Sequence, residues 1–77
     1  MRYFMSKNLP SVKPKDLIKI LLKIGFVFHR QKGSHKIFVK DNFLVVVPEH
    51  SKDLKKGTLI NIIKGTGLSA EEFFKNF

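Results

Sequence analysis

The sequence from Phe26 to Pro48, FVFHRQKGSHKIFVKDNFLVVVP, divides into three short runs separated by turn-forming residues. In the first run, FVFHRQ, side chains alternate so that Phe26, Phe28 and Arg30 share one face, which is the two-residue period of a β-strand. The second run, HKIFVK, alternates in the same way, and the third, FLVVV, is apolar on both faces until Pro48 ends it. Three successive strands joined by short turns predict an antiparallel meander.

The residues between the runs fit tight turns. Gly33 lies in the first break, and glycine readily adopts the left-handed backbone conformation that such turns require. Asp41 and Asn42 form a second candidate turn of two residues, because both tolerate positive φ. Since the third strand is apolar on both faces, we expect a partner to bury part of the sheet in addition to the chain's own helices.

Helical patterns lie on both sides of the meander. Before it, PKDLIKILLKI (residues 14–24) repeats apolar residues at steps of three and four, and Gly25 is placed to end the helix. After it, TLINIIK (residues 58–64) carries a second apolar stripe that Gly65 and Gly67 are expected to break. Each stripe predicts an amphipathic helix that packs on the sheet.

A short last helix completes the order. Ser69 followed by Glu72 is a capping box, which marks a helix start. The predicted fold class is therefore α+β, with the order α-β-β-β-α, a three-stranded antiparallel sheet and helices on one face. Five phenylalanines are expected to pack in the core rather than to stack on nucleic-acid bases: Phe4, Phe26, Phe28, Phe38 and Phe43. The alternative is base stacking by Tyr3 or by a phenylalanine exposed on the open face of the sheet. Phe73, Phe74 and Phe77 of the last helix are expected to dock on the core.

Length and composition indicate one small domain. The 77 residues are read as a single domain, residues 1–77, in which residues 1–6 form an extension with two possible starting methionines, Met1 and Met5. The chain has no cysteine, which excludes disulfides, thiolate zinc sites and cysteine nucleophiles. A domain of this kind fits a reducing cytosol, so we expect a cytoplasmic protein. No signal peptide or membrane-spanning run is visible, and no membrane contact is expected.

The charge of the chain is strongly positive. Fifteen lysines and arginines stand against six acids, giving a formal net charge of +9. A surface of this charge attracts polyanions, and nucleic acid is the most common polyanion in the cytosol. Lys15, Lys19 and Lys23 recur on the outer face of the first predicted helix, either as a solvated face or as a stripe that follows phosphates.

Cofactor and metal chemistry lack a sequence basis. The chain contains neither a GxGxxG nor a Walker motif. A metal nuclease needs several carboxylates converging on one ion, and the six acids are spread over different predicted elements, mostly at caps and turns. We therefore expect no cofactor and no metal.

The segment Gly33-Ser34-His35 is the strongest candidate for chemistry. Histidine is suited to moving protons at neutral pH, and RNA cleavage needs little more, because the ribose 2′-OH supplies the nucleophile. The turn at Gly33 would present the amides of Ser34 and His35 to a phosphate. Arg30, Lys32 and Lys36 would supply cations. The alternative is an ordinary solvated histidine after a turn.

The other two histidines are weaker candidates. His29 is interpreted as a residue on a strand face. His50 follows Pro48 at the end of the third strand and is expected near the same end of the sheet as His35. It is a candidate for a second proton-transfer or phosphate-binding group.

Six short motifs follow one another along the chain: L-P at residues 9–10, G-F at 25–26, R-x-x-G-S-H at 30–35, V-P-x-H at 47–50, K-x-G-T-L at 55–59 and G-L-S-x-E-E-F at 67–73. Each motif is short, but their order and spacing together are specific. With these motifs, the sequence from Lys7 to the C-terminus resembles the HicA family of toxins from type II toxin–antitoxin systems. Two departures are Lys13-Pro14 at the start of the first helix and the unusual residues before Met5.

The resemblance implies a fold like that of double-stranded-RNA-binding domains and a ribonuclease that cleaves mRNA and arrests translation. It also implies that the histidine of G-S-H, here His35, is catalytic, and that a HicB antitoxin blocks the active site. We expect the free toxin to be monomeric and to form a hetero-oligomer with the antitoxin. The leading hypothesis is thus a metal-independent endoribonuclease. Its rivals are a non-catalytic RNA-binding module and an interaction domain for an acidic protein.

Overall fold

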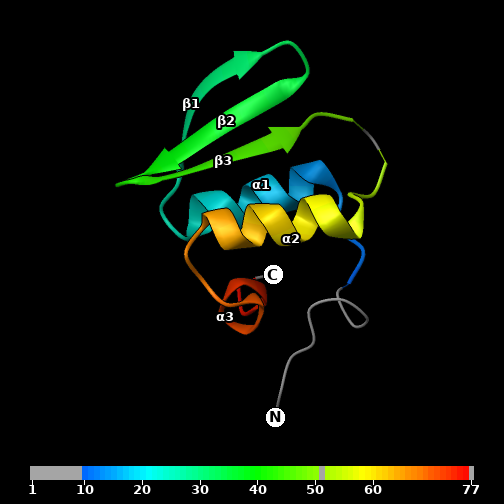
Figure 1. Cartoon of the computed structure of the whole chain (residues 1–77), viewed down its shortest axis with the longest axis vertical. Helices are drawn as coiled ribbons and strands as arrows, with labels where there is room; N and C mark the ends of the chain where they lie inside the picture. Colours follow the sequence, from blue (N-terminus) through cyan, green and yellow to red (C-terminus); the bar gives the residue numbers. More distant parts are fainter. Residues whose placement is uncertain (1–9, 51, 77) are drawn as a thin grey trace.

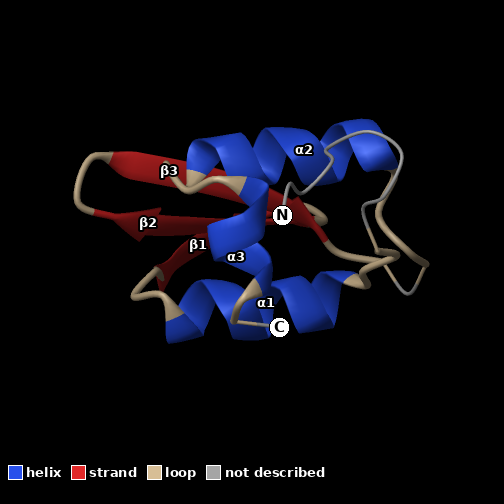
Figure 2. Cartoon of the chain, turned by 90° about the horizontal axis from the view of Figure 1, so that it is seen from below, coloured by secondary structure: helices blue, strands red, loops and turns tan. Residues whose placement is uncertain are grey.

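The computed structural model describes residues 10–50 and 52–76, which form three helices and one three-stranded sheet (Figure 1). The sheet, the pair α1 and α2, and then α3 follow one another as layers, so all helices lie on one side of the sheet (Figures 1 and 2). This confirms the predicted α+β class and the α-β-β-β-α order with a short final helix. In chain order the elements are α1 (Pro14–Lys23), β1 (Val27–Lys32), β2 (His35–Lys40), β3 (Phe43–Pro48), α2 (Lys56–Gly65) and α3 (Ala70–Phe74).

Helix α1 forms where the apolar stripe predicted it. Pro14 stands in the first turn, where its missing N–H costs nothing, and Leu17 and Leu21 are fully buried. Gly25 follows the helix with φ +103°, a left-handed conformation that lets the chain reverse and bury Phe26. The three lysines of the outer face, Lys15, Lys19 and Lys23, are exposed.

Two tight hairpins connect the strands in the order β1-β2-β3. Gly33 has φ +60° in the first turn, and Asp41 has φ +54° in the second, so both predicted turns are confirmed. The pairing of β2 with β3 is regular from His35 opposite Pro48 to Lys40 opposite Phe43.

The pairing of β1 with β2 contains a β-bulge that the alternation of the sequence did not predict. Phe28 pairs with Phe38, but the next pair is Arg30 with Ile37, so His29 is an extra residue in β1. Phe38 is buried under the helices, and Ile37 therefore faces the opposite side. The expectation that Arg30 shares a face with Phe28 is wrong, because the bulge moves Arg30 to the uncovered side of the sheet.

The core lies between the sheet and the helices. Phe26, Phe38 and Phe73 are buried in it as expected, and Phe74 packs against it. Two loop residues also enter the core: Val12 and Leu54 are buried, and the Leu54 N–H donates to the Val12 carbonyl oxygen at 2.8 Å.

Two phenylalanines depart from the predicted core. Phe28 and Phe43 are 52% and 44% exposed, because they belong to the two outer strands of the sheet. The Phe28 ring meets Phe38 edge-on, with centroids 5.8 Å apart. The extension before Lys7, the expected core position of Phe4 and the docking of Phe77 lie outside the described residues.

Helices α2 and α3 complete the layer. α2 begins at Lys56, before the predicted stripe, and ends at Gly65, the first of the two glycines that were expected to break it. The predicted capping box is present: the Glu72 N–H donates to Ser69 Oγ, and Glu72 Oε1 accepts from the Ser69 N–H. Among the described residues, no helix has the length and apolar character needed to cross a bilayer.

Candidate active site on the uncovered face of the sheet

His35 lies on the face of the sheet that the helices do not cover. It pairs with Pro48, and its neighbours on the same face are Ile37 and Val46. The alternate residues of β3, Val45 and Val47, are buried under the helices. His35 itself is exposed to solvent.

Two of the predicted cations stand on the same face as His35. Lys32 pairs directly with His35 across β1 and β2, and Arg30 pairs with Ile37, the next residue of β2 on that face. Both cations are exposed. The bulge at His29 produces this arrangement, because a regular ladder from Phe28 onward would place His29 and Gln31 there instead. His29 is exposed and belongs to the bulge.

Lys36 was expected to supply a cation near His35, but it lies on the other face of the sheet. It lies on the helix side of β2, where its Nζ is 3.4 Å from Glu49 Oε2. Its side chain is 30% exposed and therefore less accessible than Lys32 or Arg30. The structure thus groups His35 with Arg30 and Lys32, and leaves Lys36 on the opposite face.

The turn that carries His35 is tied to the end of β3 by polar contacts. The Glu49 N–H donates to the Ser34 carbonyl oxygen at 2.6 Å. Gln31 Nε2 donates to the Gly33 carbonyl oxygen and to Glu49 Oε1, each at 3.0 Å. These bonds hold the Gly33-Ser34 turn in place. The sequence did not single out Gln31 or Glu49, because their contact joins residues that are far apart in the chain.

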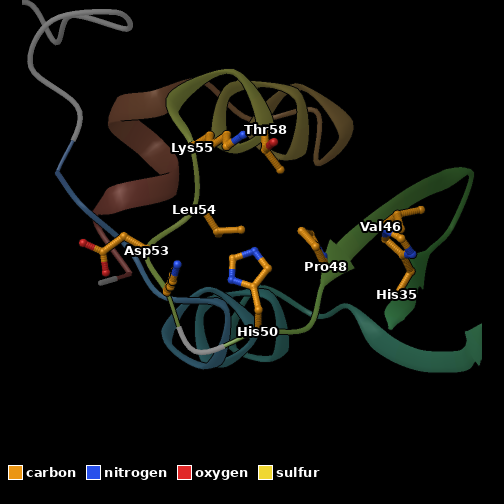
Figure 3. Close-up of a pocket in the computed structure, with 9 residues that line it drawn as sticks. His35, Val46, Pro48, His50, Asp53, Leu54, Lys55 and Thr58 are labelled. Carbon is orange, nitrogen blue, oxygen red and sulfur yellow. The ribbon is translucent and has the colours of Figure 1, made fainter. Parts of the chain in front are cut away.

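His35 and His50 line one pocket of about 510 Å³ at this end of the sheet. Figure 3 shows the His50 ring beside Leu54, below the start of α2, with Pro48 between the two histidines in that view. The rest of the pocket wall comes from the loop between β3 and α2 and from the first turn of α2. Its lining residues are His35, Val46, Pro48, His50, Lys52, Asp53, Leu54, Lys55 and Thr58.

Lys55 and Thr58 were not among the sequence candidates, although both belong to the K-x-G-T-L motif. Lys55 is exposed and precedes α2, and Thr58 is half-buried in its first turn. The pocket therefore combines two imidazoles with lysines near a helix start, where partial positive charge accumulates. Within residues 10–50 and 52–76, no three His, Cys, Asp or Glu side chains gather as metal ligands would.

The fold and this face define a class of protein: a small, basic α+β domain whose open sheet face presents a histidine beside cations. The family described as HicA toxin of bacterial toxin–antitoxin matches residues 14–68, from the start of α1 through the sheet and α2. The chain therefore belongs to the HicA family and is the toxin of a toxin–antitoxin system, which implies an antitoxin partner. No match to the chain was found among curated proteins.

Proposed function

We propose that this toxin is a metal-independent endoribonuclease that cleaves mRNA, arrests translation and is neutralised by a HicB-type antitoxin. The observation that carries the proposal is the position of His35, exposed on the open face and directly opposite Lys32. Family membership supports the toxin role, and the net charge of +9 supports a polyanionic substrate.

The reaction would follow from the chemistry of RNA. A base removes the proton of a ribose 2′-OH, the 2′ oxygen forms a bond to the adjacent phosphorus, and the bond to the 5′ oxygen breaks. The leaving oxygen takes up a proton, and the product strands carry a 2′,3′-cyclic phosphate and a 5′-OH. His35 fills one of the two proton-transfer roles. His50 is the candidate for the other, because it lines the same pocket.

The cations have distinct parts in this scheme. Lys32 and Arg30 hold the phosphate and offset the negative charge that builds on its oxygens in the transition state. Gly33 and Ser34 set the backbone that carries His35, and Gln31 and Glu49 brace that turn. Lys36 adds only to the overall positive charge, because its ammonium group lies on the other face of the sheet and is paired with Glu49.

The direct test is incubation of labelled single-stranded RNA with the purified protein in excess chelator. The account predicts RNA fragments with cyclic-phosphate ends, and no cleavage of a DNA strand of the same sequence, which lacks the 2′-OH. Binding without cleavage after hours at saturating protein would instead indicate a non-catalytic RNA-binding module. Cleavage that disappears with chelator would rule out the metal-independent mechanism.

A further inference from the structure

The outer edge of β3 has unpaired backbone groups that point away from the sheet. The hydrogen bond from the Glu49 N–H to the Ser34 carbonyl oxygen fixes which residues of β3 bond to β2. In an antiparallel ladder every second residue bonds to the neighbouring strand, so Phe43, Val45 and Val47 bond to β2. The N–H and C=O groups of Leu44 and Val46 therefore face outward, where no other described strand pairs with them. The Leu44 carbonyl oxygen lies close to the end of α2, 3.2 Å from the position of a Cβ at Gly65, so the Leu44 N–H and both groups of Val46 are the more open ones.

The two edges of the sheet differ in how they are protected. Exposed edge strands are normally blunted by charged residues, bulges or proline, which discourage pairing with another chain. β1 has a bulge at His29 together with Arg30 and Lys32. The β3 edge is regular and apolar, and it has only Pro48 at one end. β3 is therefore the edge at which another strand can add.

Beside this edge, β3 has an apolar surface on the uncovered face and a groove of mixed polarity on the helix side. Leu44 and Val46, on the uncovered face, are 54% and 40% exposed. Below the edge, a groove runs between β3 and α2 and includes Thr58 and Asn61. A strand added to β3 would place one row of its side chains over the uncovered face and the alternate row into this groove.

The positive charge beside the groove favours an added strand that carries acidic residues. Lys55 lies at the pocket end of the groove, and Lys64 follows Asn61 by one turn on the same side of α2. A second copy of this chain would bring another net charge of +9 to the same edge, which is repulsive. A strand that alternates apolar and acidic residues would complement both the apolar surface and the lysines.

We propose that the antitoxin docks by adding an extended segment of alternating apolar and acidic residues to the β3 edge as a fourth strand. This inference rests on the antitoxin partner of the proposed function and assigns it a docking site. Val46 belongs both to this edge and to the wall of the pocket that contains His35. A strand on β3 therefore closes one side of the pocket and obstructs RNA entry.

Hydrogen exchange on the wild-type complex tests the docking site. The probe is the protein encoded by the reading frame next to this gene, mixed with the toxin without RNA. The amides of Leu44 and Val46 are expected to exchange at least about tenfold more slowly in the complex, because a new strand would bond to them. Formation of a complex without this change would overturn the proposal, and so would the absence of a complex. RNA cleavage by the free toxin is scored separately, so a failure of the nuclease proposal remains distinguishable.

A pair of matched variants tests the same site by affinity. Leu44→Lys puts a charge at the centre of the edge, and Leu22→Lys changes a leucine of similar exposure, 52%, on α1. The account predicts that Leu44→Lys weakens antitoxin binding at least about tenfold, with Leu22→Lys close to wild type. Equal affinity of both folded variants would contradict it. A free toxin that dimerises, with β3 amides protected in the dimer, would assign the edge to a second copy instead.

Discussion

At the scale of single residues, four residues close to His35 in the sequence differ in how well their positions could be predicted. Gly33 and Ser34 are adjacent in the chain, so the turn could be predicted. Lys32 could be predicted as a nearby cation, and its position directly opposite His35 follows from the hairpin register. Lys36 could not be placed by sequence distance alone, because its ion pair with Glu49 joins two strands. Adjacency in sequence puts consecutive strand residues on opposite faces, and this separates Lys36 from His35.

Substitution of Gly33 tests the turn that presents His35. Gly33 has φ +60°, and beyond its two chain neighbours no residue lies within 4 Å of the position that a Cβ would occupy, so only backbone strain opposes a side chain there. Gly33→Ala should lower the free energy of unfolding by about 1–2 kcal/mol. Gly33→Asn is the matched control and should lose less, because asparagine tolerates the left-handed region. Chemical denaturation measures both values, and equal losses would contradict the assignment of the cost to backbone strain.

At the scale of elements, the strands and helices followed from periodicity, and the departures have local causes. The bulge in β1 adds one residue without an obvious glycine or proline to mark it, so simple alternation put Arg30 on the wrong face. The exposure of Phe28 and Phe43 depends on β1 and β3 being outer strands, and strand order is a property of the assembled sheet. The contribution of Lys55 and Thr58 to the pocket likewise depends on how α2 meets the end of β3.

Two glycines of α2 provide a test of how this helix packs on β3. A Cβ at Gly65 would lie 2.8 Å from Val45 Cγ1 and 3.2 Å from the Leu44 carbonyl oxygen, whereas a Cβ at Gly57 would have nothing within 4 Å apart from its chain neighbours and the backbone of its own helix. Gly65→Ala should therefore destabilise the protein by about 1–3 kcal/mol, because α2 must move away from buried β3 atoms. Gly57→Ala should stabilise it by up to about 1 kcal/mol through backbone entropy. Thermal or denaturant unfolding measures the change in stability of both variants. A change of the same sign in both would contradict this packing of α2 on β3.

At the scale of the whole molecule, the positive charge is spread over several surfaces, and composition alone could not say which of them the proposed RNA substrate would contact. Lysines occupy the outer face of α1, the loop before α2 and the uncovered face of the sheet. The structure distinguishes these surfaces by their neighbours. Arg30 and Lys32 share a face with His35, whereas Lys15 and Lys19 lie on α1, in the helix layer on the other side of the sheet.

Salt dependence of RNA binding tests this assignment. In a His35→Ala background, in which cleavage is expected to be slow, log affinity should fall with log salt by about 0.7 for each phosphate neutralised. Replacing Arg30 and Lys32 by alanine should reduce the slope by about 1.4 if each contacts one phosphate. Replacing Lys15 and Lys19 is the matched control and should leave the slope unchanged. If the slope of log affinity against log salt falls only in the α1 variant, RNA binds to the helices. This result would remove the basis for cleavage at His35.

The most direct test of the central claim is the single-turnover rate of RNA cleavage, in chelator, for wild-type protein, His35→Ala and His29→Ala. His29 is an exposed histidine of the neighbouring strand and controls for the loss of an imidazole from the sheet. The account predicts that His35→Ala slows cleavage by about 10² to 10⁴ with little change in RNA affinity, and that His29→Ala cleaves like wild type. Cleavage by His35→Ala at a rate near that of wild type would contradict it.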